Sequence, residues 1–127
     1  MENAGIIIIG NEILSGRTLD KNSNYISDRC SKAGIRVKEI RIVEDDKKVI
    51  IKNVLNFSKK FTHVFVTGGI GPTHDDKTAE AIASAFKRKI QINKKAKSLL
   101  TAHYKKSNLD LNENRMKMAK IPLGARI

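Results

Sequence analysis

The hydrophobic positions of the chain form short runs and periodic stretches that alternate along the sequence. Three strands are predicted: Ala4–Ile9 and His63–Thr67 are short runs rich in β-branched residues, and Val37–Val43 alternates loosely. Apolar residues at the spacing of amphipathic helices follow each run. The order β-α-β-α-β-α predicts a parallel sheet with helices on both faces, because right-handed crossovers leave no other compact arrangement. We therefore expect an α/β fold with three layers, α/β/α, and a mostly parallel sheet.

Apolar residues at helical spacing predict where the helices lie. Ile26, Cys30 and Ala33 share one face of a helix that ends at Gly34. The acidic segment Glu44–Asp46 predicts the start of a second helix. The stripe expected to be buried in that second helix consists of Ile50, Val54, Phe57 and Phe61. The face expected to be buried in a third helix consists of Ala79, Ile82, Ala83 and Phe86.

Weaker patterns follow toward the C-terminus. Ile90–Ile92 predicts a short edge strand, and Lys94–Tyr104 predicts a basic amphipathic helix. The residues expected to face inward from that helix are Ala96, Leu99 and Leu100. Asn112–Lys120 predicts one more short helix, stopped by Pro122. With 127 residues the chain is expected to form a single domain, residues 1–127.

Composition narrows the class of protein. The formal net charge is +12, but the lysines are spread along every predicted helix and no nucleic-acid-binding signature is present. Nucleic acid is therefore not expected as a partner, although the positive field would draw small anions toward a site. No apolar stretch reaches the length of a membrane span and no signal peptide is recognisable, so we expect a cytoplasmic protein with no membrane partner. The single cysteine, Cys30, is expected in the core.

The segment Thr67–Thr78, TGGIGPTHDDKT, carries the strongest indication of chemistry. Gly68, Gly69 and Gly71 allow the backbone to turn sharply and bring its N–H groups close to an anion. The unpaired N–H groups of the helix expected to start near Asp76 would face the same space. This pattern predicts a phosphate site, and the alternative is a tight strand-to-helix turn that merely requires glycine.

Two carboxylates adjoin this glycine-rich segment. Asp75 and Asp76 would repel a phosphate unless a cation or a proton-transfer step employs them, and Mg²⁺, or another divalent metal, is the natural cation. Asp76 is also expected to serve partly as a helix N-cap. His74 is a possible ligand or base, but a lone histidine in a loop is more often polar surface.

Two further loops are expected at the same edge of the sheet, where the strands end. The loop Gly10–Gly16, GNEILSG, supplies Glu12 as an acidic group and Ser15 as a possible phosphate donor. Asp45 follows the second predicted strand. For Asp45, a role as a helix cap is as good an interpretation as a role in a site.

These motifs together resemble one family. The segments GNEILSG, DKN (Asp20–Asn22), VEDD (Val43–Asp46) and TGGIGPTHDDKT occur in the order and spacing of the molybdopterin-binding domain family. This family is known from molybdenum-cofactor biosynthesis proteins and from the N-terminal part of CinA-like competence/damage-inducible proteins. The resemblance covers roughly residues 4–125, including a weaker match at Asn114–Gly124, and GGIGPT followed by DDKT is similar to the CinA branch.

The resemblance implies a three-layer α/β/α fold, molybdopterin or a nucleotide as ligand, Mg²⁺-assisted chemistry at a phosphate, and association into dimers or trimers. Asp45 and Asp76 match two catalytic aspartates, and Glu12 matches the acid of the first loop. The residues that match the phosphate-binding loop are Thr67, Gly68, Gly69, Gly71, Thr73 and Thr78. Relatives adenylylate molybdopterin or insert molybdate, and the CinA branch is associated with ADP-ribose pyrophosphatase activity. Asp75 replaces a non-acidic residue of some adenylyltransferase-like relatives, which favours the CinA-like activity.

The sequence departs from the family at its C-terminus. The chain stops at Ile127, where relatives continue through an N-P-x-G-x-A-P-G segment that helps to close the pocket. We therefore expect a truncated domain. Two hypotheses follow: an enzyme in which Asp75 and Asp76 hold the cation and Asp45 positions or deprotonates the nucleophile, or a non-catalytic module that binds a pterin or nucleotide.

Overall fold

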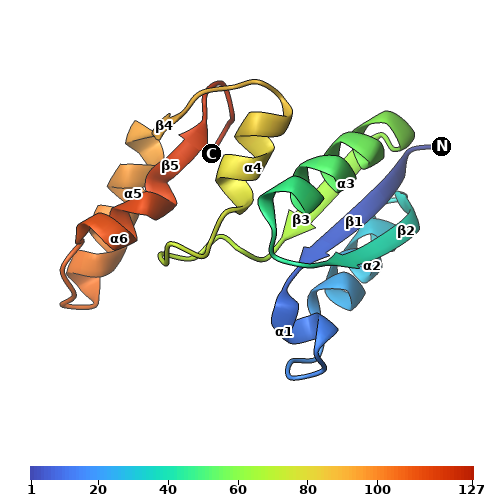
Figure 1. Cartoon of the computed structure of the whole chain (residues 1–127), viewed down its shortest axis with the longest axis horizontal. Coiled ribbons are helices and arrows are strands. Elements are labelled where there is room, and N and C mark those ends of the chain that lie inside the picture. The colour runs from blue at the N-terminus through green and yellow to red at the C-terminus, as the bar shows by residue number, and fades with distance from the viewer.

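The computed structural model describes all residues, 1–127, and contains five strands (Figure 1). The elements of the first part are β1 (Asn3–Ile9), α1 (Asn11–Leu14), α2 (Asn22–Lys32), β2 (Arg36–Val43), α3 (Lys47–Lys60) and β3 (His63–Thr67). Those of the second part are α4 (Thr78–Ala85), β4 (Ile90–Ile92), α5 (Lys94–Lys106), α6 (Glu113–Met116), a 3₁₀ helix (Lys117–Ala119) and β5 (Lys120–Pro122). The segment Gly10–Gly16, expected as a loop, therefore contains the single helical turn α1.

The first three strands form a parallel sheet in the order β2-β1-β3. In the central strand, Ile7 pairs with Arg41 on one side and with Val66 on the other. Both pairings are parallel, so the carboxyl ends of all three strands meet at one edge of the sheet. The predicted parallel sheet is confirmed, and this edge collects the loops that follow β1, β2 and β3.

Helices cover both faces of the sheet. On one face, Ile7 and Ile9 pack with Ile50, Val54 and Phe57 of α3, and Ala81 of α4 completes the cluster. The alternate side chains of β1, Ile6 and Ile8, point to the other face, where α2 packs on β1 and β2, and both are buried. The predicted three layers are confirmed, as is the burial of Cys30 in α2.

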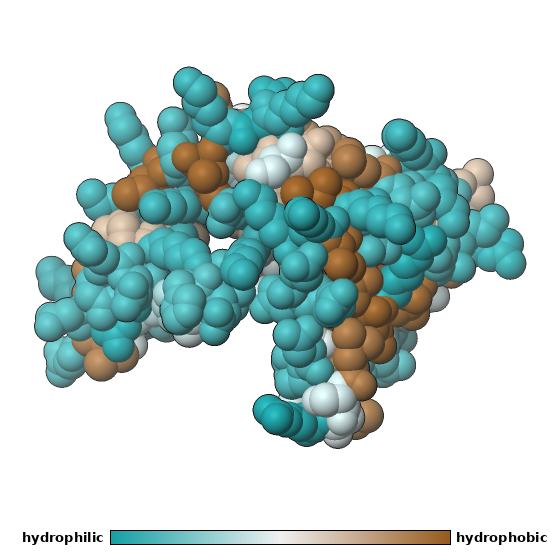
Figure 2. All heavy atoms as spheres, in the orientation of Figure 1, coloured by the Kyte–Doolittle hydropathy of each residue, from teal (hydrophilic) through white to brown (hydrophobic).

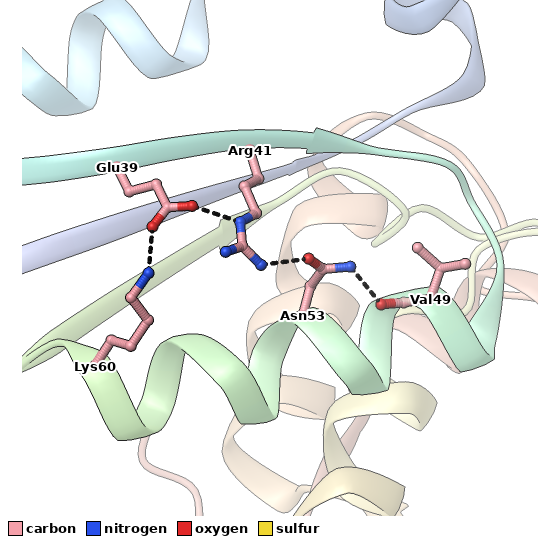
Figure 3. A network of polar contacts seen from close by, with 5 residues as sticks. All are labelled: Glu39, Arg41, Val49, Asn53 and Lys60. Carbon is pink, nitrogen blue, oxygen red and sulfur yellow. Dashed lines mark hydrogen bonds and ion pairs between the residues drawn. The ribbon is translucent and has the colours of Figure 1, made fainter.

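A polar network fixes α3 against the edge strand β2 (Figure 3). Arg41 donates to Glu39 at 2.6 Å and to the side chain of Asn53 at 2.9 Å, and Lys60 donates to the other oxygen of Glu39 at 2.7 Å. The Arg41 guanidinium also lies 4.6 Å from the ring centre of Phe57. Hydrogen bonds from Lys60 and Arg41 lower the pKa of Glu39. Because α3 begins two residues after Asp45, this network also holds the loop that carries Asp45.

The second part of the chain differs from several predictions. The strand at Ile90–Ile92 exists, but it pairs antiparallel with β5 in a separate two-stranded sheet. The helix predicted over Asn112–Lys120 divides into α6, a 3₁₀ turn and the start of β5, and Pro122 lies inside β5. Proline is tolerated there because the strand lies at an edge.

Two predicted helix faces are partly wrong. In α4 Ala83 is buried as predicted, but Ala81, which the prediction omitted, is buried too, and Phe86 lies beyond the last helical residue and is 46% exposed. In α5 Ala96 is buried as predicted, but Leu99 is 57% exposed. Both helices are buried mainly through small residues, so the large apolar residues at helical spacing did not mark the whole contact face.

The visible surface is mostly hydrophilic, with hydrophobic patches between the charged side chains (Figure 2). Large hydrophobic residues that are exposed include Tyr25 of α2 and Ile40 and Ile42 of β2. None of the helices combines the length and the apolar character that crossing a bilayer requires.

Candidate functional site

The loops after β1 and β2 are joined directly by hydrogen bonds. The N–H of Gly10 donates to the carbonyl of Val43 at 3.1 Å, which extends the strand pairing by one step. The N–H of Asp45 donates to the side-chain oxygen of Asn11 at 2.9 Å. These contacts place Glu12, in the first turn of α1, on the same edge of the sheet as Asp45.

The glycine-rich loop after β3 makes a turn that only glycine can adopt. Gly68 has a φ of +92°, and a Cβ there would lie 2.0 Å from the carbonyl oxygen of Ile9. Gly69 has a φ of +64°, and its Cβ would lie 2.3 Å from the hydroxyl of Thr78. Both glycines are thus required by the turn itself. Within this turn the N–H groups of Gly69 and Ile70 donate to no backbone carbonyl, so they are free to bind an anion.

Two threonine hydroxyls hold the loop in place. Thr78 is buried, and its hydroxyl donates to the carbonyl of Gly68 at 2.6 Å while its N–H donates to the carbonyl of Gly69 at 3.1 Å. The hydroxyl of Thr73 donates to Asp76 Oδ2 at 2.8 Å. In this arrangement both hydroxyl protons serve the loop, and their proposed contact with phosphate stays a prediction.

Asp76 does not cap the following helix, contrary to the prediction. Lys77 occupies the N-cap position of α4 without a side-chain hydrogen bond, and the helix starts at Thr78. Asp76 instead closes its own turn, accepting from the N–H of Thr73 at 3.0 Å as well as from its hydroxyl. Slight burial acts to raise the pKa of Asp76, but the hydrogen bonds from Thr73 and Gly71 and the charge of Lys117 outweigh it and lower the pKa. Asp76 is therefore held as a carboxylate.

Asp45 is free of the capping role that was its alternative interpretation. The N-cap of α3 is Asp46, whose side chain accepts from the N–H of Val49 at 3.1 Å. Asp45 itself is half-buried, and its Oδ1 atom is inaccessible to solvent and has no hydrogen-bond partner. Burial raises the pKa of Asp45, and the charge of Asp76 raises it further, against the charge of Lys77.

The carboxylates of Asp76, Asp75 and Glu12, on the loops after β3 and β1, thus influence the pKa of Asp45 on the loop after β2. Asp75 and Glu12 also raise the pKa of Asp45, with smaller effects than Asp76. Asp75 lies at the outside of the loop, with 77% of its side chain exposed, and pairs with the still more exposed His74 at 3.4 Å. No three His, Cys, Asp or Glu side chains lie close enough together to hold a metal ion on their own.

Residues of the glycine-rich segment line two hollows. Gly69, Gly71 and Asp76 line a cavity of about 610 Å³ that extends toward α4 and β5. Thr67, Gly68 and Glu12 line a second, smaller pocket of about 240 Å³. Asp20–Asn22 complete that pocket, where Asn22 donates to the hydroxyl of Thr67 at 3.2 Å. Ser15 lines neither hollow, is exposed, and donates to the carbonyl of Glu12.

Lys117 is a residue of the site that the sequence did not single out. Its ammonium donates to the carbonyl of Asp76 at 2.6 Å and to the carbonyl of Thr73, and so it clamps the turn that orients the Asp76 carboxylate. Lys117 is one of 25 lysines and arginines, and although it lies within the weaker match at Asn114–Gly124, nothing in that segment distinguished it from the other basic residues. Asn11 and Asn22 were also missed, although both lie inside the quoted motifs GNEILSG and DKN.

Comparison with known proteins identifies the family of the chain. Residues 5–125 match the model of a family described as a probable molybdopterin binding domain. The chain belongs to the molybdopterin-binding domain family. A protein of Sulfolobus acidocaldarius is 45% identical over 130 residues, covering 98% of this chain and 48% of that protein. Protein M1627_2099 of Saccharolobus islandicus is 41% identical over 123 residues, covering 96% of this chain and 47% of that protein. The chain therefore spans about half the length of these curated relatives.

Solved structures agree with a molybdopterin-binding fold. CinA from Thermoplasma acidophilum, described as a protein of unknown function, superposes with a TM-score of 0.88 at 35% identity, covering 98% of this chain and 73% of that one. The molybdopterin biosynthesis enzyme MoaB from Thermus thermophilus superposes with a TM-score of 0.65 at 18% identity, covering 99% of this chain and 76% of that one. This chain is thus similar to CinA in sequence and structure, and it shares its fold with MoaB.

The turn at Gly68 is expected to tolerate no side chain. Gly68→Ala combines a positive φ with a steric clash, whereas Gly34→Ala has a φ of +77° with nothing within 4 Å of the new Cβ. Denaturant unfolding should show that Gly34→Ala costs about 1–2 kcal/mol, and that Gly68→Ala costs about 1–3 kcal/mol more. Equal losses in the two variants would contradict the close contact between Gly68 and Ile9.

Asp45 is expected to destabilise the fold when it is ionised. Because its pKa is raised above the ordinary value of 3.8, the folded state holds the proton more tightly, and this contribution to stability is lost as pH rises through the raised pKa. Asp45→Asn should therefore raise Tm at pH 7 by about 1–3 °C, and the gain should fade toward pH 4.

The matched control for this change is Asp46→Asn, which removes the same charge from the same loop but keeps an N-cap residue. It should show no comparable gain. A loss of stability in Asp45→Asn at pH 7 would refute the crowding of carboxylates. In a strongly positive chain, an ionised aspartate without such crowding would stabilise the fold, and its removal would then lower Tm.

Proposed function

We propose that this domain binds a phosphate-bearing pterin or nucleotide at the carboxyl edge of the parallel sheet and carries out metal-dependent chemistry on its phosphate or pyrophosphate. The observation that carries the proposal is the meeting of Asp45 and Asp76 beside a glycine-rich loop with free N–H groups. Active sites are places where like charges are brought together although this lowers the stability of the fold. The carboxylates around Asp45 are such a group.

The loop supports binding of an oxyanion. Gly69 and Ile70 offer two adjacent N–H groups, and the net charge of +12 favours anionic ligands at any site on the molecule. N–H groups fixed by a rigid turn need no rearrangement to neutralise charge that develops on a phosphoryl oxygen.

A divalent cation fits the carboxylates. The Oδ1 atom of Asp45 is buried without a hydrogen-bond partner, which is a costly state for a carboxylate unless a cation shares it. Mg²⁺ keeps several of its waters and binds through one or two carboxylates together with phosphate oxygens, so it needs no group of three protein ligands. Asp76 would hold it together with phosphate oxygens, Asp45 would lie beside it, and Asp75, expected as a ligand, lies further out. Bound Mg²⁺ would neutralise charge on the phosphoryl oxygens.

The two aspartates would take different roles in the reaction. Asp76, with a lowered pKa, stays ionised and is oriented by Thr73 and Lys117. Asp45, with a raised pKa, is suited to accept a proton from the attacking water or hydroxyl. Hydrolysis of an ADP-ribose-type pyrophosphate and adenylyl transfer to molybdopterin both fit this division.

The alternative is a module that binds the same ligands without turnover. It is favoured by the observation that no three His, Cys, Asp or Glu side chains lie close enough together to hold a metal ion on their own. Association into dimers or trimers stays a prediction.

The proposal is tested by thermal shift and turnover with ADP-ribose, nucleotides and pterin phosphates, each with and without Mg²⁺. Tm should rise with ligand concentration, more so with Mg²⁺, since a ligand of the native state stabilises by mass action. ADP-ribose turnover should fall by about 100-fold or more in Asp76→Asn and in Asp45→Asn, while both variants stay folded.

The control is Asp28→Asn, which removes a carboxylate paired with Lys32 on the surface of α2. It should leave binding and turnover unchanged. Binding without any product would establish the non-catalytic alternative, and equal turnover in Asp76→Asn and the unsubstituted protein would refute the catalytic assignment.

A further inference from the structure

We propose that a second copy of this chain docks on the outer edge of β2, so that two parallel sheets join through antiparallel β2 strands across a twofold axis. β2 is an edge strand, because β1 is its one partner in the order β2-β1-β3. In Figure 1 it lies on the side of the sheet away from the orange and red elements. The N–H and C=O groups along such an edge can pair with another strand.

The middle of β2 carries two isoleucines that stay exposed in the single chain. Ile40 and Ile42 are 45% and 39% exposed. They lie beside Ile6 and Ile8 of β1, on the face of the sheet that α2 covers. The isoleucines of the central strand are buried, whereas those of β2 remain partly in solvent. A second copy that extends the sheet would cover them.

The backbone of the same two residues is turned outward. In a strand the N–H and C=O groups of one residue point to the same side, and successive residues alternate. The carbonyl of Val43 accepts from Gly10 in continuation of β1, so Val43 and Arg41 turn their backbone groups toward β1. Ile40 and Ile42 therefore turn theirs toward the free edge. Two Ile40 residues placed opposite each other would exchange two backbone hydrogen bonds.

A bulge confines the pairing to the second part of the strand. Ala4 pairs with Val37 and Gly5 pairs with Glu39, so Lys38 is an extra residue in β2. Bulges and lysines are devices that protect a sheet edge from pairing. The regular stretch that follows, Glu39–Val43, has neither device.

The order of charges in β2 selects one register. A twofold axis perpendicular to the sheet keeps each side chain on its own face, so one residue of β2 must lie opposite its own copy. With Lys38, Glu39 or Arg41 at the axis, like charges would face each other, which is destabilising. With Ile42 at the axis, the pairing would run past the end of the strand. With Ile40 at the axis, Glu39 of each copy lies opposite Arg41 of the other.

The side chains of this register have the capacity for the new contacts. Within its own chain Arg41 donates through Nε to Glu39 and through Nη1 to Asn53, which leaves N–H groups of the guanidinium for the Glu39 carboxylate of the second copy. On the other face, Lys38 would lie opposite Ile42 of the second copy. There the aliphatic part of Lys38 can cover the isoleucine while its ammonium stays in water.

The first test measures association. A ladder of this length makes a small interface, so sedimentation equilibrium in about 0.15 M salt should show a monomer–dimer equilibrium with a micromolar Kd. Ile40→Lys places two lysines opposite each other at the axis and should raise that Kd about tenfold or more. The control is Leu99→Lys, which makes the same kind of change at a 57% exposed residue of α5 and should leave the Kd unchanged.

The second test measures the register by oxidative cross-linking. In the proposed dimer the two Cα atoms at position 40 lie about 5.5 Å apart, within the range that a disulfide spans. Ile40→Cys should therefore form a covalent dimer under mild oxidation. Ile42→Cys is the matched control, because its two copies would lie roughly 14 Å apart along the strands and should not link. The unsubstituted protein, whose Cys30 is buried, should not link either.

The outcomes are independent of the proposed function. A chain that stays monomeric into the millimolar range, or a dimer that Ile40→Lys does not weaken, would overturn the inference. A dimer that links through Ile42→Cys rather than Ile40→Cys would overturn the register on which it rests. Binding and turnover of phosphate ligands by a monomer would leave the proposed function intact, and a dimer that binds no such ligand would leave this inference intact.

Discussion

The crowding of carboxylates around Asp45 is the interaction on which the rest of this account depends. Parallel strands in the order β2-β1-β3 bring three loops to one edge, and those loops place Asp76, Asp75 and Glu12 near a half-buried aspartate with an unpartnered oxygen. A fold gains nothing in stability from such an arrangement, because like charges in a partly desolvated space repel. Its presence beside free N–H groups of the glycine-rich loop supports the proposal of a site that is completed by a cation and an anion together.

The two halves of the chain contribute differently to this site. The parallel sheet fixes the carboxylates, through the bond from Asp45 to Asn11 and through the network of Arg41 that holds α3 on β2. The second half reaches the site through Lys117, which clamps the turn at Asp76, and through the wall of the cavity formed by Met118 and Ile121. Membership of the molybdopterin-binding domain family and similarity to CinA are consistent with this division.

The sequence predicted the sheet and the convergence of the loops because both follow from local patterns. Buried β-branched runs such as Ala4–Ile9 identify central strands, and a parallel topology then determines where Asp45 and Asp76 meet. Capping roles were not predictable, because Asp45 and Asp46 are adjacent and identical, and only the backbone geometry selects Asp46. Lys117 was not predictable either, since its contact spans 41 residues and lysine is abundant throughout the chain.

The most direct measurement is the titration of the Asp45 carboxyl carbon by NMR, in the unsubstituted protein and in Asp76→Asn. The account predicts a pKa for Asp45 above its ordinary value of 3.8, and a lower pKa once the charge at position 76 is removed. An Asp45 that titrates at its ordinary value, or that does not respond to Asp76→Asn, would show that the two aspartates do not share a site.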